Sequence, residues 1–299
     1  MITSFDAIFE HVKNKPRKRL VAAYANDSHT IGAVSLAIDA GIVDATLVGD
    51  AKTIKQVCET IEIDYSKFAV VQEADENKAA LTAVEFVSKG EGDILMKGLC
   101  STDKYMRAIL NKEIGLLPPN GILSHITLMS SSAYHKLLLF SDIAVIPAPN
   151  LKQKIAMCGY LIKAAKSLGI EKPKVAVIAA TEQVSPGMQA CVDAAILSKM
   201  ADRGQIAGAY VDGPLAVDLA IDEEAKEIKK VSGIVAADAD CLLFPNIEAG
   251  NVFYKTVGKF TNAQLAAMVV GAKAPCVLSS RGDTTETKLN SIALAALNC

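Results

Sequence analysis

The sequence of 299 residues has little net charge, because 31 basic and 33 acidic residues leave a formal charge of -2. So small a charge gives no overall field that would recruit nucleic acid or an anionic membrane, and any bound anion must be held locally. Long apolar runs are lacking too, since stretches such as 265–270 fall far short of the roughly 20 residues that span a bilayer. Residues 1–20 are polar and show no export signal. We expect a cytoplasmic protein with no membrane or nucleic-acid partner.

Clustered metal ligands and paired cysteines are also absent. The 7 cysteines form no C-x-x-C pair and the 4 histidines have no metal-ligand spacing. We therefore expect reduced cysteines in the core, no disulfide set and no metal site. Cys100 stands apart because it follows Lys97 and Gly98 at a predicted strand end, where a cation would lower the pKa of a thiol. No general base is identifiable beside Cys100, so we predict a core role for it.

Common phosphate and acyl motifs are missing from the chain. Neither G-x-G-x-x-G nor G-x-x-x-x-G-K-[ST] occurs, which removes the main sequence support for a dinucleotide-binding turn and a P-loop. The nucleophile elbow G-x-S-x-G is absent as well. A site for phosphate or an acyl group must be built in another way.

Short β-rich runs alternate with helix-length segments along the whole chain. This pattern predicts an α/β fold with a largely parallel sheet. The length indicates one large or two moderate domains, and we take the break at 147–150 as the boundary. The runs predicted as strands are 20–25, 46–48, 68–71, 93–96, 175–179, 209–212, 241–244 and 268–270.

The segment 95–107 is the first candidate site, because ligands bind at the carboxyl ends of parallel strands. Lys97 ends a predicted strand, Ser101 and Thr102 can cap the next helix, and Arg107 lies about one and a half turns into that helix. A phosphate could use the helix start, the hydroxyls and the lysine together. The alternative is a capped helix with solvated basic residues.

The segment 245–255 is the second candidate. Asn251, Tyr254 and Lys255 are three and four residues apart, so they share one face of a predicted helix. That face is polar where a core helix would be apolar. It is either a binding face or a stripe of solvated side chains.

The third candidate follows the apolar run 275–278, which breaks into Ser279, Ser280 and Arg281 before a helical pattern begins. A hydroxyl and a guanidinium at a strand-to-helix switch predict a phosphate site. Asp283 and Glu286 are predicted in the first helical turn, where capping alone is a sufficient reason for them. Capping does not account for Ser280 and Arg281, which precede the helix.

At these three segments the chain resembles the phosphate acetyl/butyryltransferase family, and more its butyryl than its acetyl branch. The resemblance implies direct transfer between acyl-CoA and phosphate in a ternary complex, with CoA as a substrate and no tightly bound cofactor. The strings that carry it are LMKGLCSTDKYMRAILNKEIGL, TEQVSPGMQACVDAAILSKMADRGQIAGAYVDGPLAVD, AADADCLLFPNIEAGNVFYK and VVGAKAPCVLSSRGDTTETKLNSIALA.

The resemblance also implies a two-domain, three-layer αβα fold of the isocitrate/isopropylmalate dehydrogenase type. Residues 1–148 plus 280–299 would form the first domain and 149–279 the second, with a homodimer through the second and the active site in the interdomain cleft. Ser280 and Arg281 match the family's phosphate-binding pair. Arg107 matches an arginine linked with CoA or phosphate recognition, and Ser101 and Thr102 fall in the same family segment.

One departure from the family pattern concerns the general base. The acetyl branch has an aspartate seven residues beyond the motif serine, where this chain has Thr287. A threonine hydroxyl is no carboxylate base near neutral pH, so Glu286, favoured over Asp283, would take that role, or nearby cations would drive thiol deprotonation.

Three alternatives to butyryl transfer stay open. The first is a phosphate acetyltransferase, and the second is a non-catalytic module that binds CoA or acyl phosphate. The third is a metal- and NAD(P)-dependent decarboxylating dehydrogenase, whose metal would need clustered carboxylates. Acids that could serve it are Asp212, Asp218, Asp238 and Asp240.

Overall fold

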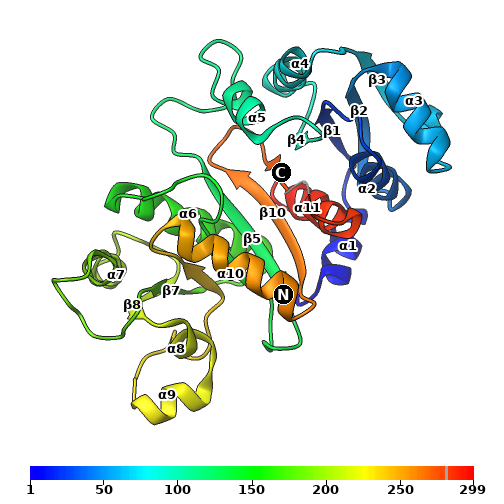
Figure 1. Cartoon of the computed structure of the whole chain (residues 1–299). Helices are drawn as coiled ribbons and strands as arrows, with labels where there is room; N and C mark the ends of the chain where they lie inside the picture. The colour runs from blue at the N-terminus through cyan, green and yellow to red at the C-terminus, as the bar shows by residue number, and fades with distance from the viewer. Residues whose placement is uncertain (280–281) are drawn as a thin grey trace. The chain divides into compact units, whose positions relative to one another are not determined.

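The computed structural model describes residues 1–279 and 282–299, which form two compact units (Figure 1). The first unit comprises residues 5–123 and 265–299, and the second comprises residues 1–4 and 124–264. Residues 1–4, 124–148 and 265–279 therefore lie on the other side of the expected boundary, and the last two of these segments carry strands. Hydrogen bonding between strands is the physical reason, because the strands in these two segments pair with partners inside the unit that holds them.

The first unit is an α/β unit with strand order β3-β2-β1-β4-β11-β10. Its strands are parallel except β10, which pairs antiparallel with β11. Its elements are α1 (Phe5–Lys13), β1 (Lys18–Ala23), α2 (Ser28–Asp39), β2 (Val43–Gly49), α3 (Ala51–Thr60), the 3-10 helix η1 (Tyr65–Lys67), β3 (Ala69–Gln72), α4 (Glu76–Ser88), β4 (Ile94–Lys97), α5 (Thr102–Ile109), β10 (Gln264–Val270), β11 (Cys276–Val277) and α11 (Thr285–Leu297).

Buried parallel strands make the core of the first unit. The last four residues of β1 and all of β4 are buried, and this continuous burial is typical of strands covered on both faces. Helix α11 packs against α2 and β11, so the end of the chain belongs to the unit that contains β1 (Figure 1). The carboxyl ends of β1, β4 and β11 consequently lie side by side.

The second unit has strand order β5-β6-β9-β7-β8, in which β5 and β6 are antiparallel and the other pairs are parallel. Asn150 caps its longest helix in a capping box. The Asn150 side chain accepts from the Gln153 backbone N–H, and the Gln153 side chain accepts from the Asn150 backbone N–H. Its elements are β5 (Ser124–Ser130), β6 (Leu138–Ser141), α6 (Leu151–Ser167), β7 (Lys174–Ile178), α7 (Gln189–Asp202), β8 (Tyr210–Leu215), α8 (Val217–Ile221), α9 (Glu223–Lys229), β9 (Cys241–Leu243) and α10 (Ile247–Phe260).

The structure confirms the predicted α/β class and the mostly parallel pairing. Each predicted strand run overlaps an observed strand, whereas β5 and β6 were not predicted. Strand β5 carries buried polar residues, Ser124, His125 and Thr127, which interrupt the apolar pattern. Within the described part of the chain, no helix has both the length and the apolar character needed to cross a membrane.

Candidate functional site

Lys97 is the last residue of β4 and is buried, with 3% of its surface exposed. Its ammonium group donates a hydrogen bond to the carbonyl oxygen of Gly98, 3.1 Å away. The backbone of Gly98 lies against the end of β1, where its N–H donates to the Ala23 carbonyl at 2.9 Å. A Cβ at position 98 would come within 2.5 Å of the Tyr24 carbonyl oxygen, so glycine permits this approach. Lys97, predicted to bind phosphate, thus lies at the end of β4 where the chain runs against the end of β1.

Cys100 lies beside Lys97 but has the environment of a core residue. Its surface is fully buried, and its Sγ lies 3.6 Å from the Ala23 carbonyl oxygen. Burial raises the pKa of the Cys100 thiol to about 11, although the charge of Lys97 acts in the opposite direction. The thiol is therefore protonated near neutral pH, as the predicted core role requires.

The amino end of α5 already has a carboxylate partner within the first unit. Ser101 is the N-cap, and its Oγ accepts from the Lys104 N–H at 3.3 Å. The backbone N–H of Ser101 donates to Glu76 at 2.6 Å, and Lys104 forms an ion pair with the same carboxylate. Thr102 is exposed at the first helical position. An incoming phosphate would meet the Glu76 carboxylate at this helix start.

Arg107 has the geometry of a solvated surface residue. Its side chain is 78% exposed, and its Nε donates to the Asp103 carboxylate at 3.0 Å, one helical turn away. The alternative of a capped helix with solvated basic residues fits the helical part of this segment around Arg107, whereas Lys97 at its start is buried. The guanidinium keeps further N–H donors for a ligand, because an arginine carries five of them.

Helix α11 begins after the third predicted segment. Ser280 and Arg281, the predicted phosphate pair, lie outside the described residues. Thr284 is the N-cap and accepts a hydrogen bond from the Thr287 N–H at 3.1 Å. Asp283 precedes this cap, so its predicted place in the first turn is wrong. Glu286 does lie in the first turn and is exposed.

Lys288 is the residue of this segment that the sequence patterns missed. It is 4% exposed, and its ammonium donates to the Ser279 hydroxyl at 2.9 Å. Burial lowers the pKa of Lys288, and the charges of Asp27 and Asp283 act against that shift. The sequence signal that could have found it is its position directly before the largely apolar helical stretch 289–297.

Asp27 follows β1 and caps α2. One oxygen of its carboxylate, Oδ1, accepts from the Thr30 N–H at 2.9 Å. The other oxygen, Oδ2, is buried with no hydrogen-bond partner among the described residues. This second oxygen is thus an acceptor without a hydrogen bond in that part of the chain, and the carboxylate interacts with Lys288 through charge.

In the second unit, Asp142 organises the loop that follows β6. Its carboxylate is 1% exposed and accepts from the Ser124 hydroxyl at 2.9 Å and from the N–H of Ala144 at 2.8 Å. Further backbone donors to it are His125, Val145 and Ile146. These bonds satisfy a buried carboxylate without a cation and fix the backbone that contacts α10.

The predicted polar face of α10 is only partly polar. The side chain of Asn251 donates to the Ile143 carbonyl at 3.0 Å, so it holds the loop after β6. Tyr254 is buried at 6% exposure, which corrects the expected polar face, because its ring packs inward from the helix. Lys255 is exposed, with its ammonium 5.2 Å from the centroid of the Tyr254 ring.

Comparison with known proteins connects these sites to a family. The family model described as "Phosphate acetyl/butaryl transferase" matches residues 3–80 and 67–296. The chain belongs to this family. It is 47% identical to phosphate butyryltransferase from Clostridium acetobutylicum, over 99% of this chain and 98% of that protein. It is 38% identical to phosphate acetyltransferase from Thermotoga maritima, over 98% of each chain.

A solved structure supports the same assignment. The crystal structure of a branched-chain phosphotransacylase from Enterococcus faecalis V583 matches with a TM-score of 0.82 and 31% identity, covering 94% of this chain and 98% of that one. The resemblance found in the sequence is thereby confirmed. As a member of the phosphate acetyl/butyryltransferase family, the chain is an acyltransferase.

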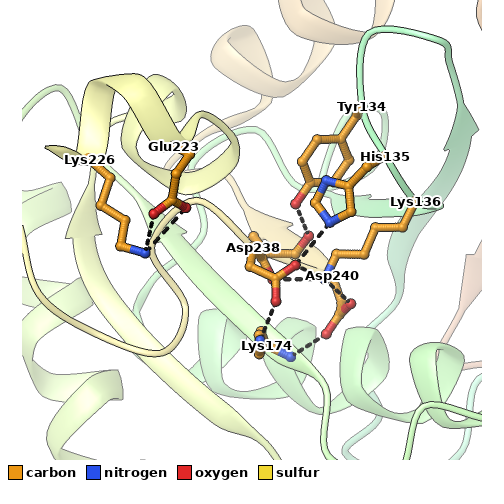
Figure 2. A network of polar contacts seen from close by, with 9 residues as sticks. Tyr134, His135, Lys136, Lys174, Glu223, Lys226, Asp238 and Asp240 are labelled. Atoms are coloured by element: carbon orange, nitrogen blue, oxygen red, sulfur yellow. Dashed lines mark hydrogen bonds and ion pairs between the residues drawn. The ribbon is translucent and has the colours of Figure 1, made fainter.

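In this family member, the acidic residues of the dehydrogenase alternative are engaged by cations or by backbone donors. Asp238 and Asp240 share Lys136, whose ammonium lies 2.7 Å from a carboxylate oxygen of each (Figure 2). Lys174 and His135 also contact Asp238. The Asp212 carboxylate accepts from the Gly213 N–H at 2.8 Å, and Asp218 pairs with Lys229 at 2.8 Å.

These contacts explain the charge state of Asp238. Partial burial alone would raise the pKa of its carboxyl, but hydrogen bonds and charges from Lys136, Lys174 and His135 outweigh burial and hold that pKa well below its usual range.

Across residues 1–279 and 282–299, no three His, Cys, Asp or Glu side chains are grouped so that they could hold a metal ion.

Proposed function

We propose that the chain transfers a short, butyryl-like acyl group between CoA and phosphate, directly within a ternary complex. The names of its relatives include both butyryl- and acetyltransferases. Acyl length depends on pocket volume, and one methylene changes binding by only about 1–3 kcal/mol, so we expect overlapping activity on neighbouring chain lengths. The higher identity to the butyryltransferase supports butyryl as the preferred substrate.

The observation that carries this proposal, beside the family, is the pair of buried lysines in the first unit. Lys97 is 3% exposed at the end of β4, and Lys288 is 4% exposed and bonded to Ser279 at the end of the neighbouring β11. In one direction the CoA thiolate meets acyl phosphate, and in the other phosphate attacks the thioester while charge develops on its carbonyl oxygen. Cations held in a dry environment offset the repulsion between these anions.

We assign the roles of the candidate residues as part of the same proposal. Ser280 and Arg281 bind phosphate with Lys97, because a guanidinium and a hydroxyl are matched donors for its oxygens. The α5 group, in which Thr102 and Arg107 are exposed and Ser101 caps the helix, contacts the phosphates of CoA. The α10 group of Asn251, Tyr254 and Lys255 contributes to acyl-CoA binding.

The reaction needs a thiolate in one direction and a phosphate nucleophile in the other. The CoA sulfur attacks the carbonyl carbon of acyl phosphate, a C–S bond forms, the C–O bond to phosphate breaks, and phosphate leaves with its electron pair. Glu286, favoured over Asp283, accepts the thiol proton, since Thr287 has no carboxylate. Donors from Ser280 and Arg281 stabilise charge on the departing phosphate.

Three further parts of the proposal concern the assembled protein. We assign the isocitrate/isopropylmalate dehydrogenase type of three-layer fold, supported by a first unit whose chain returns in residues 265–299. We also propose a homodimer through the second unit. A cytoplasmic location is supported by seven free cysteines, which suit a reducing compartment.

A phosphate-dependent assay of thiol release tests the proposed function. Purified protein is given acetyl-, propionyl- and butyryl-CoA with and without phosphate, and free CoA is measured. We expect release that requires phosphate and is fastest with butyryl-CoA. Binding of CoA without release from any of the three would instead support the non-catalytic module.

Matched arginine variants test the phosphate site. Replacement of Arg281 by glutamine should raise the KM for phosphate, because a bidentate donor to the anion is lost. Arg17→Gln is the control, since Arg17 lies just before β1 and pairs with Asp44 on the surface at 3.1 Å. An equal effect of both replacements would remove the assignment of Arg281.

A further inference from the structure

Lys288 is one of the two buried lysines named above, and its direct contact with Ser279 is not explained by a general offset of anionic charge. A lysine side chain usually carries its ammonium to solvent, yet this one is 4% exposed within α11. Burial disfavours the charged form and lowers the pKa of Lys288. A lysine at this position therefore costs free energy that an apolar residue would not.

Lys288 interacts with groups that follow two strands of the first unit, one by a hydrogen bond and one through charge. Its ammonium donates to Ser279, the residue that follows Leu278 after β11, at 2.9 Å. Asp27, which follows β1, acts on it through charge, as does Asp283 before the cap of α11. The buried Oδ2 of Asp27 has no hydrogen-bond partner among the described residues, so the nearby ammonium compensates its charge.

We propose that Lys288 is a positioning residue for acyl transfer, whose ammonium holds the Ser279 hydroxyl, next in sequence to the proposed phosphate ligands Ser280 and Arg281. The proposal rests on the proposed function, because it concerns the same phosphate site. A charge-assisted hydrogen bond in a buried setting is stronger than one between neutral groups, and its direction is fixed by the helix that carries the lysine.

A double-mutant cycle with Lys288→Met and Ser279→Ala tests this role. Each single variant should lower kcat/KM for phosphate by roughly tenfold or more, the usual effect of losing a hydrogen bond to a charged group. The double variant should have a kcat/KM for phosphate no lower than that of the less active single variant, because both replacements remove the same contact. Ser279→Thr keeps the hydroxyl and should restore activity, and the KM for butyryl-CoA should stay unchanged in all four.

Ser291→Ala is the matched control on the same helix. Ser291 is fully buried, and its hydroxyl donates to the Thr287 carbonyl at 2.6 Å and accepts from the Ala267 N–H at 2.9 Å. Its removal should lower the melting temperature and leave the KM for phosphate unchanged. This separates a loss of packing from a loss of positioning.

Additive effects in the cycle, or a folded Lys288→Met variant with wild-type phosphate kinetics, would overturn the proposal. If Lys288→Met does not fold, Ser279→Ala and Ser279→Thr decide the question, because a contrast between them in phosphate kinetics is still required. Failure of the wild-type protein to release thiol would refute the proposed function instead, so the two outcomes are distinguishable.

Discussion

The buried ion pair between Lys154 and Asp193 makes a quantitative prediction about the stability of the second unit. It joins α6 to α7 at 2.7 Å, and both side chains are 5% exposed. The other carboxylate oxygen of Asp193 accepts from the side chain of Gln189 at 2.8 Å. Replacement of Lys154 by methionine keeps the length and apolar stem of the side chain but leaves the carboxylate buried without its cation.

The expected cost follows from that burial. Breaking a buried pair by removing one partner typically costs about 3–5 kcal/mol, because the remaining charge is poorly solvated. At about 1.4 kcal/mol for each factor of ten, this corresponds to a loss of roughly two to nearly four orders of magnitude in the folding equilibrium. The hydrogen bond from Gln189 remains and favours the lower part of this range.

Urea unfolding followed by far-ultraviolet circular dichroism measures the effect as a change in midpoint at constant slope. Lys199→Met is the matched control, since Lys199 lies on α7 and pairs with Asp202 at 2.8 Å with side chains 63% and 59% exposed. An exposed pair of this kind contributes at most about 1 kcal/mol. The double variant Lys154→Met, Asp193→Leu should recover most of the loss, because it leaves no buried charge.

The reasoning is refuted if Lys154→Met lowers stability no more than Lys199→Met does. It is also refuted if the double variant is less stable than Lys154→Met alone. The first result would mean that the pair is solvated in the folded protein, contrary to its burial in the structure, and the second would mean that the unpaired carboxylate is not the source of the loss.

Three further perturbations have defined outcomes. Gly250→Ala should destabilise the protein by about 1–3 kcal/mol in urea unfolding, because its Cβ would come within 2.2 Å of the Asp142 carbonyl oxygen. The control Gly159→Ala meets no atom within 4 Å and should stabilise α6, so equal effects of the two replacements would contradict this. Because the pKa of Asp238 is lowered in the folded protein, its contribution to stability should be present above about pH 4 and lost as the pH falls. Asp238→Asn should therefore weaken the fall of the melting temperature at acid pH, and an unchanged fall would contradict the network. Cys100→Ala should keep full turnover in the thiol-release assay, because burial holds the pKa of this thiol at about 11; lost turnover in a folded variant would restore a nucleophilic role.

Sequence alone was sufficient where a local pattern has one structural meaning. Buried parallel strands appear in a sequence as short apolar runs. The predicted run 20–25 overlaps β1, and the predicted run 93–96 overlaps β4. Asn150, in the break at 147–150, is the N-cap of α6, and such a cap can be predicted locally because it acts within a few residues. The family strings also predicted the acyltransferase assignment, since they combine several segments far apart in the chain.

Tertiary contacts decided what no local pattern contains. The boundary at 123–124 depends on β5 and β6 pairing with each other and on β6 pairing with β9, which is remote in sequence. Tyr254 is buried on a face that its neighbours mark as polar. Lys288 donates a hydrogen bond to Ser279 after β11 and interacts through charge with Asp27, which follows a different strand, β1. Spacing along the chain determines which side chains share a face, but only the packing of strands and helices determines which of them lose solvent and meet a partner.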